Sequence, residues 1–201
     1  MLYLKRAVMK IRTGIAQGRF HIIHWGHVEY LLKAKEECEY LVIGVTDCDT
    51  ERAYFNYSED IAKYDLENLL KPYRRFDNPI FPFTFYDRMK MIKDSLIEQG
   101  INPLEFDIVP FPVHKLHFVK YYIPSDSVIL ATVYDEWGRK KIEMFENMGF
   151  KVKILWERTL DERFTTGTEV RRRITEGEQW RHLVPPSVYE YINKILKNFK
   201  I

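Results

Sequence analysis

Two histidines near the N-terminus stand at a spacing that suits chemistry on phosphate groups. His24 and His27 are three residues apart, with Gly26 between them, where a predicted strand gives way to a predicted helix. The N-terminus of a helix presents free N–H groups and the positive end of the helix dipole, and both attract phosphate. Gly26 removes a side chain where the anion must approach, and Arg19 adds a fixed positive charge. This set suits the charge that builds up on a phosphoryl group under attack.

The histidine pair also has two simpler interpretations. Histidines at this spacing could ligate a metal, although no cysteine or carboxylate stands beside them to complete a ligand set. They could also be ordinary polar residues of a loop. Their place between the first strand and the first helix, directly after Gly18-Arg19-Phe20, makes the phosphate interpretation more specific.

A second cluster, TTGTEVRRR over residues 165–173, opens a predicted helix after the last predicted strand. Thr166 or Thr168 can cap that helix, so the simpler interpretation is an ordinary N-cap followed by a solvated basic helix. The functional interpretation is that hydroxyls, backbone N–H groups and Arg171 grip the outer phosphates of a nucleotide. Three consecutive arginines cannot share one helix face, so we expect one or two of them to face the ligand.

The elements that position these clusters alternate along the chain. The predicted strands cover residues 10–16, 40–45, 106–109, 127–133 and 151–156. The predicted helices cover residues 26–37, 85–99, 137–148, 168–175 and 185–199. Repeated strand–helix order implies a parallel sheet with helices on both faces.

The chain length of 201 residues suits one domain with a small appendage. Residues 49–78 show no sustained period and form a long insertion, either a functional flap or a contact element. A C-terminal helical part covers about residues 166–201.

Composition narrows the class of protein. The net charge of +2 gives no support for a general polyanion binder, so we expect no nucleic-acid partner. No apolar stretch reaches signal-peptide or membrane-spanning length, so we expect no membrane partner. Cys38, on a predicted helix, and Cys48 form no CxxC pair and read as free thiols of a reducing compartment. A cytoplasmic protein is the expectation.

Both clusters resemble signatures of one family. GRFHIIHWGH over residues 18–27 resembles the GRFxPxHxGH signature of the nucleotidyltransferase superfamily with the HxGH motif, and TTGTEVRRRI over 165–174 resembles its Ile-Ser-x-Thr-x-x-Arg element. Residues 78–92 and 177–192 are similar to segments of archaeal-type nicotinamide-nucleotide adenylyltransferases. The resemblance runs from about residue 12 to about residue 192.

The resemblance implies a Rossmann-like doubly wound parallel five-stranded sheet with a C-terminal helical segment, and an active site at the carboxyl ends of the strands. It implies that His24 and His27 contact the NTP phosphates and stabilise the transition state. Mg²⁺ would be bridged by phosphates and water, without protein ligands. The other residues expected at the NTP phosphates are Gly18, Arg19, Phe20, Gly26, Thr166, Thr168 and Arg171.

The chain departs from the family pattern where the acceptor should bind. The family's Asp-x-Asn and tryptophan, which hold a pyridine nucleotide, are replaced by residues 112–118, and its Gly-Asn turn after the fourth strand by residues 134–137. Aromatic residues in the first of these stretches have a simpler interpretation as helix packing on the sheet. The acceptor-binding candidates are His114, Lys115, His117, Phe118 and Arg88.

The implied reaction is an in-line attack by an acceptor phosphate oxygen on the α-phosphate of ATP, with release of pyrophosphate and no protein nucleophile. The expected acceptor is nicotinamide or nicotinate mononucleotide. One alternative is the same chemistry on another phosphorylated small molecule, as in a cytidylyltransferase. A further alternative is a non-catalytic nucleotide-binding protein, against which the intact histidine pair argues. The resemblance leaves a homo-oligomer open, because many relatives are oligomers.

Overall fold

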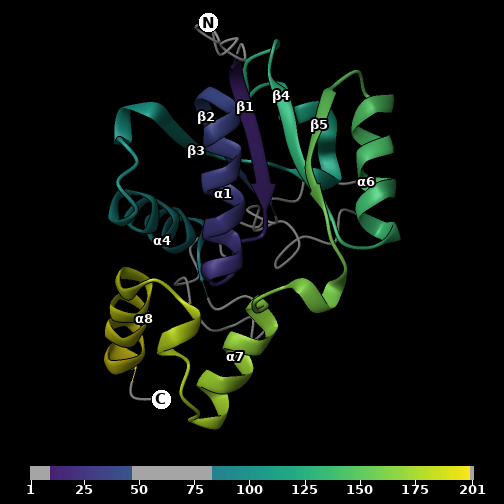
Figure 1. The fold of residues 1–201 in the computed structure, drawn as a ribbon. Helices are drawn as coiled ribbons and strands as arrows, with labels where there is room; N and C mark the ends of the chain where they lie inside the picture. Colours follow the sequence, from purple (N-terminus) through teal and green to yellow (C-terminus); the bar gives the residue numbers. More distant parts are fainter. Residues whose placement is uncertain (1–9, 47–82, 200–201) are drawn as a thin grey trace, which may run out of the picture.

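A single parallel sheet organises the chain. The computed structural model describes residues 10–46 and 83–199, and within them five strands pair in the order β3-β2-β1-β4-β5 (Figure 1). Every pairing is parallel. This arrangement confirms the predicted Rossmann-like doubly wound fold. The strands are β1 (Ile11–Gly18), β2 (Cys38–Val45), β3 (Phe106–Pro110), β4 (Val128–Val133) and β5 (Lys151–Glu157).

The strand order reverses direction once, and the helices follow that reversal. The chain starts at the middle strand, adds β2 and β3 on one side, and then adds β4 and β5 on the other. Because crossover connections are right-handed, α1 (Trp25–Glu37) and α6 (Glu136–Asn147) must cover opposite faces. Figure 1 shows α1 and α4 (Phe85–Glu98) on one side of the sheet and α6 on the other.

Successive strand residues supply the two faces of the core. Ala16 and Leu130 pack in the cluster that contains the buried residues of α1 and α4. Ile15 and Ile129, one position earlier in each strand, pack with Phe145 of α6 in a second cluster. Side chains of a strand point alternately to opposite faces, so a sheet buried on both sides reads as a continuous apolar run.

The C-terminal helices lie beyond the carboxyl ends of the strands, toward which β1 points in Figure 1. Val188 and Ile192 of α8 (Pro186–Phe199) join the core cluster that holds α4. The Tyr191 hydroxyl donates to the buried Asp87 carboxylate of α4 at 2.7 Å. This packing fixes the neighbouring α7 (Gly167–Glu176) near the sheet's carboxyl edge. The remaining short helices are α5 (Leu116–Val119) and the 3-10 turns Pro103–Glu105, Val113–Lys115, Leu160–Glu162 and Arg181–Leu183.

The predicted elements are confirmed to within a few residues, with one correction. Cys38 was expected on the first helix, but α1 ends at Glu37 and Cys38 begins β2, where it pairs with Ile11. The thiol is buried and free. Cys48 and the insertion over residues 49–78 lie outside the described residues, and the single-domain organisation stays a prediction. Among the described helices, none combines the length and apolar character that a membrane crossing requires.

Candidate active site

A pocket of about 530 Å³ opens at the carboxyl edge of the sheet. Its walls come from the β1–α1 turn, from the start of α6 with the residues before it, and from residues 163–171. The two histidines and the seven residues expected at the NTP phosphates all line this one pocket: Gly18, Arg19, Phe20, His24, Gly26, His27, Thr166, Thr168 and Arg171. The fold therefore brings together two segments about 140 residues apart in the sequence. In α/β folds, ligands bind at the carboxyl ends of the strands, where such distant segments meet. The roles of the nine residues remain predictions.

The β1–α1 turn is built around an unusual backbone angle. Phe20 adopts a φ of 48°, in the left-handed region that residues other than glycine rarely enter. Its buried ring lies edge-on against His27, with 5.1 Å between ring centroids. A Cβ atom on Gly18 would come within 2.9 Å of that ring. Gly18 thus leaves room for the Phe20 ring, which packs against His27. Backbone strain of the kind seen at Phe20 concentrates at functional sites.

The two imidazoles form a stacked pair at the start of α1. Their centroids are 3.7 Å apart and their planes 25° from parallel. The Nδ1 atoms of His24 and His27 are buried and have no hydrogen-bond partner among the described residues. Buried polar atoms in proteins are ordinarily paired. A Cβ atom on Gly26 would lie 3.2 Å from the His24 ring, so this glycine keeps the approach to the imidazole open.

Burial lowers the pKa values of these histidines and so favours the neutral imidazole. It lowers the pKa of His24 to about 4, with further lowering by the charges of Arg163 and Arg171. Burial also holds the pKa of His27 well below its ordinary value, and the neighbouring His24 adds to this. A third pocket histidine, His21, has its pKa lowered to about 3, chiefly by burial. The neutral His27 ring already has a hydrogen bond to the Ile22 backbone, which partly offsets the lowering. An arriving phosphate would raise all three pKa values, and a protonated imidazole can donate from both of its nitrogens.

The start of α7 supplies hydroxyl groups and one arginine. Thr166 caps the helix, and its Oγ1 accepts a hydrogen bond from the Glu169 backbone N–H at 3.1 Å. Arg171 donates to the Thr168 hydroxyl at 3.1 Å. The Oγ1 of Thr165 is buried in the pocket wall and has no partner among the described residues. Three threonine hydroxyls, a guanidinium and a helix N-terminus therefore line the same pocket as the imidazole pair.

The other two arginines of α7 are held by carboxylates. Arg172 pairs with Glu169, Glu176 and Glu178, and Arg173 pairs with Glu169 at 2.7 Å. Neither lines the pocket. Of the three consecutive arginines, Arg171 is the one that the pocket wall includes, and it forms no ion pair within residues 10–46 and 83–199.

The acceptor candidates of residues 114–118 lie after β3. His114 and Lys115 belong to the 3-10 turn Val113–Lys115, and His117 and Phe118 to α5, with 4.2 Å between the ring centroids of the latter two. Lys115, His117 and Phe118 are not among the described residues that line the pocket, and the side chain of His114 lies outside the described part of the chain. Their contact with an acceptor stays a prediction.

Arg88, the fifth acceptor candidate, is buried behind the β1–α1 turn. Its guanidinium donates to the carbonyl oxygens of Arg19, at 2.9 Å, and Thr46, at 2.8 Å. Its Nε also donates to the Thr84 carbonyl at 3.4 Å. These bonds tie the end of β2 and the start of α4 to the turn that carries the histidines.

Sequence reasoning missed several residues of the pocket wall. The basic ones, besides His21, are Lys141 of α6 and Arg163, neither of which belongs to a recognised motif. Helical spacing was the one available signal, because Lys141 follows Trp137 by four residues and both line the pocket. No comparable signal marks Arg163, which lies in a loop.

The described carboxylates of the pocket are already engaged. Glu29 accepts from Arg158 at 2.7 Å, and Asp135 caps α6 by accepting from the Gly138 N–H at 2.8 Å. In the described part of the chain, no group of three or more His, Cys, Asp or Glu side chains has an arrangement that could hold a metal ion. A Mg²⁺ ion bridged by ligand phosphates and water, without protein ligands, stays a prediction.

Comparison with known proteins settles the family. Residues 15–66 match the family model described as cytidylyltransferase-like. A phosphonoformate cytidylyltransferase from Streptomyces viridochromogenes is 36% identical over 182 residues, which cover 90% of this chain and 91% of that protein. The chain belongs to the nucleotidyltransferase superfamily. A nicotinamide-nucleotide adenylyltransferase from Pyrococcus furiosus is 26% identical to this nucleotidyltransferase, over 92% of the chain and 85% of that protein.

Solved structures agree with the fold of the nucleotidyltransferase. A bifunctional NMN adenylyltransferase/ADP ribose pyrophosphatase from Francisella tularensis superimposes with a TM-score of 0.62 at 16% identity. The match covers 93% of this chain, and the chain spans about half (50%) of that protein's length. This likeness supports the α/β architecture, while the sequence relatives establish that the chain is an enzyme that transfers nucleotidyl groups.

Proposed function

We propose that the enzyme transfers a nucleotidyl group from an NTP to a phosphoryl or phosphonyl oxygen of a small acceptor and releases pyrophosphate. One observation carries this proposal: two buried imidazole nitrogens without partners share a pocket with four basic side chains that form no ion pair among the described residues. Such a pocket costs stability in the free protein unless a polyanion occupies it. The basic residues are Arg19, Lys141, Arg163 and Arg171.

The reaction needs no protein nucleophile. The acceptor oxygen forms a bond to the α-phosphorus in line with the departing oxygen, the bond from the α-phosphorus to the oxygen bridging to the β-phosphate breaks, and pyrophosphate leaves. His24 and His27 donate hydrogen bonds to the oxygens on which charge develops. Arg171 and Thr168 hold the outer phosphates that become the leaving group. Mg²⁺ bound to the phosphates would neutralise part of their charge.

Two substrate pairs have support. CTP with a small phosphonate or phosphate acceptor is favoured, because the phosphonoformate cytidylyltransferase matches at 36% identity over nine-tenths of both chains. ATP with nicotinamide mononucleotide is the second candidate, because several archaeal adenylyltransferases match over a similar length at 25–27% identity. The ATP-dependent reaction was the first expectation from the sequence motifs, and the stronger match shifts the preference to CTP.

A pyrophosphate-release assay tests the proposal. The purified protein is given Mg²⁺ with ATP or CTP, and with phosphonoformate, nicotinamide mononucleotide or nicotinate mononucleotide in turn. We expect release that depends on both an NTP and an acceptor, with CTP and phosphonoformate the best pair. The folded double variant His24→Ala/His27→Ala controls for contaminating enzymes. Release that requires no acceptor, or that the double variant retains in full, would contradict nucleotidyl transfer at this site.

A further inference from the structure

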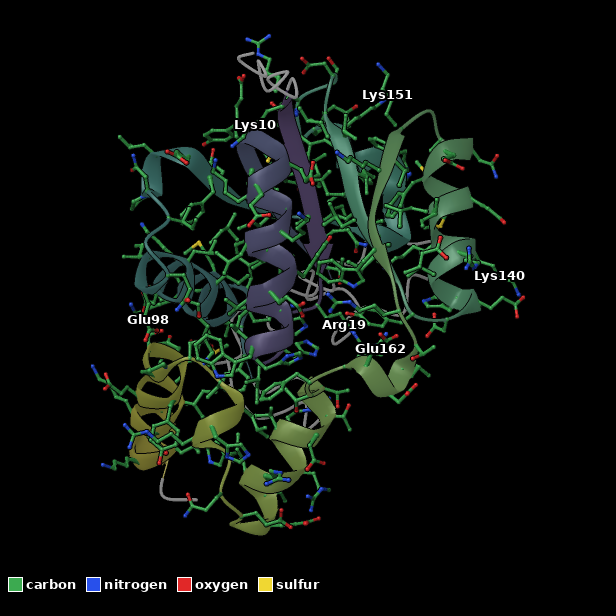
Figure 2. All side chains as sticks on the ribbon, viewed as in Figure 1. Lys10, Arg19, Glu98, Lys140, Lys151 and Glu162 are labelled. Carbon is green, nitrogen blue, oxygen red and sulfur yellow. The ribbon has the colours of Figure 1, made fainter. Side chains whose placement is uncertain are left out.

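Helix α6 carries a second run of three basic residues, Arg139, Lys140 and Lys141, that no family motif marks. Two of the three are neutralised on the outside of the molecule. Arg139 pairs with Glu157 of β5 at 2.5 Å, and Lys140 pairs with Glu136 at 3.1 Å. Figure 2 shows Lys140 on the outer side of α6, away from the middle of the molecule where Arg19 lies.

Lys141 faces the other way. It lines the pocket together with Trp137 and Gly138, which precede it by four and three residues and therefore share its helix face. It forms no ion pair within the part of the chain that the structure describes. Burial and the positive charges of Arg163 and Arg19 lower its pKa, and Asp135 offsets this only in part. A half-buried ammonium among other cations has an electrostatic preference for an anion.

Arg163 approaches the same place from the loop after β5. Its guanidinium lies 4.1 Å from the ring centroid of Tyr134, a cation–π contact that fixes its position without neutralising it. Tyr134 is itself held, because its hydroxyl accepts from the Trp156 indole N–H at 3.0 Å. The charge of Arg163 acts on both His24 and Lys141. It therefore lies within electrostatic range of both the histidine pair and the start of α6.

We propose that Lys141 and Arg163 form the acceptor-binding end of the pocket, and that the acceptor is a small compound with a second anionic group besides the phosphoryl or phosphonyl group that attacks. This inference rests on the proposed function. Arg19 and Arg171 suffice to match a triphosphate whose charge Mg²⁺ partly neutralises. With the NTP alone, Arg163 would have no ion-pair partner among the described residues and Lys141 would be offset only in part by Asp135, so the two cations favour a second anion, such as a carboxylate on a phosphonate.

Binding and kinetics of Lys141→Gln test the proposal, with Lys140→Gln as the matched control one residue away. We expect Lys141→Gln to raise the KM of the acceptor at least ~10-fold and to change the KM of the NTP by less than about twofold. Lys140→Gln should change neither. Lys141→Arg, which keeps the charge, should recover most of the acceptor affinity. If the NTP KM rises as much as the acceptor KM, Lys141 belongs to the triphosphate site and the proposal is overturned.

Calorimetry with two probes separates this proposal from the proposed function, because it needs no turnover. We expect phosphonoacetate, with a carboxylate and a phosphonate, to bind the wild-type protein at least ~10-fold more tightly than methylphosphonate. Lys141→Gln should abolish that difference, while its unfolding temperature stays that of the wild type. Equal affinity of the two probes for the wild-type protein, or an undiminished difference in Lys141→Gln, would overturn the proposal even if the enzyme turned over every NTP tested.

Discussion

Helices α6 and α7 each carry three consecutive basic residues, and in both helices two of these residues pair with glutamates while the third lines the pocket. In α7, Arg172 and Arg173 are covered by glutamates, whereas Arg171 lines the pocket. In α6, residues 139 and 140 have glutamate partners, whereas Lys141 lines the pocket. Successive residues of a helix point about 100° apart, so the three side chains of each run point in three different directions and cannot all face the pocket. A cation left without a carboxylate at a pocket, beside sequence neighbours that have one, marks a place for an anionic ligand.

The two pocket residues differ in how they can be recognised. Arg171 belongs to the TTGTEVRRRI signature, and the resemblance predicts its role. Lys141 belongs to no signature, and its place follows from the packing of α6 against the end of β4. We therefore propose that Arg171 binds the NTP, the substrate type that nucleotidyltransferases share, and that Lys141 binds the acceptor, which differs from one enzyme to the next.

We expect removal of an imidazole to lower the reaction rate more than any other single change. The proposed role of the stacked histidines is at the α-phosphate, where the bond to the acceptor forms and the bond to pyrophosphate breaks. We expect His27→Ala to lower kcat at least ~100-fold, the scale for loss of one preorganised donor to developing charge. The measurement is steady-state turnover of a variant whose circular dichroism matches the wild type. Turnover within a few-fold of the wild type would remove His27 from the catalytic set.

The α7 side offers its own controls. We expect Arg171→Gln to raise the KM of the NTP about 10-fold with little change in kcat, because a phosphate contact made in both ground and transition states is uniform binding. Arg172→Gln should leave NTP binding within about twofold of the wild type, since its partners are glutamates. Steady-state kinetics gives the KM and kcat of each variant, and isothermal titration with a non-hydrolysable NTP analogue gives its affinity for the nucleotide. Equal losses of NTP affinity in Arg171→Gln and Arg172→Gln would contradict the proposal that only Arg171 binds the NTP.

Acid should destabilise the free protein through the neutral histidines. His24 has a pKa of about 4 in the fold, below its ordinary 6.5, so the unfolded chain binds the extra proton more readily. The stabilisation is complete above about pH 6.5 and declines as the pH falls toward about 4. We expect the unfolding temperature to drop by several degrees between about pH 7 and pH 5. The unfolding temperature should depend less steeply on pH in His24→Asn and in the presence of an NTP analogue. An unchanged pH dependence in His24→Asn would contradict a lowered pKa of His24.

We expect the smallest change in KM from substitution of Tyr134, whose ring lies against the guanidinium of Arg163. Tyr134→Phe keeps the ring under the guanidinium and loses the hydrogen bond from Trp156. We expect the KM of the acceptor to rise about threefold, a fraction of a hydrogen bond's usual worth, with the NTP KM unchanged. Tyr134→Leu, which also removes the aromatic face, should raise the acceptor KM further. An effect confined to the NTP would place Arg163 on the triphosphate side.

The predictable and unpredictable parts of this enzyme differ in physical origin. Strand and helix positions follow from local apolar periodicity, and His24, His27 and Arg171 from short motifs at helix starts, so both were within reach of the sequence. The entry of Lys141 and Arg163 into the pocket depends on how α6 is rotated and how a loop closes, which local sequence does not encode.

Two further details lay beyond local patterns. Cys38 continues the helical period of α1 in sequence, yet pairing with Ile11 draws it into β2, because tertiary hydrogen bonding overrides propensity. Phe20 takes a left-handed backbone angle that no propensity scale assigns to phenylalanine, and the space left by Gly18 permits it.

The most direct test of the division between α6 and α7 is a crossed measurement of two Michaelis constants in two variants. The KM values of the NTP and of the acceptor are determined for Arg171→Gln and for Lys141→Gln, with Arg172→Gln and Lys140→Gln beside them. The account predicts that Arg171→Gln raises mainly the NTP KM, that Lys141→Gln raises mainly the acceptor KM, and that the two controls raise neither. If both pocket variants raised the same KM, or if the controls matched them, the two helices would not divide the substrates as described.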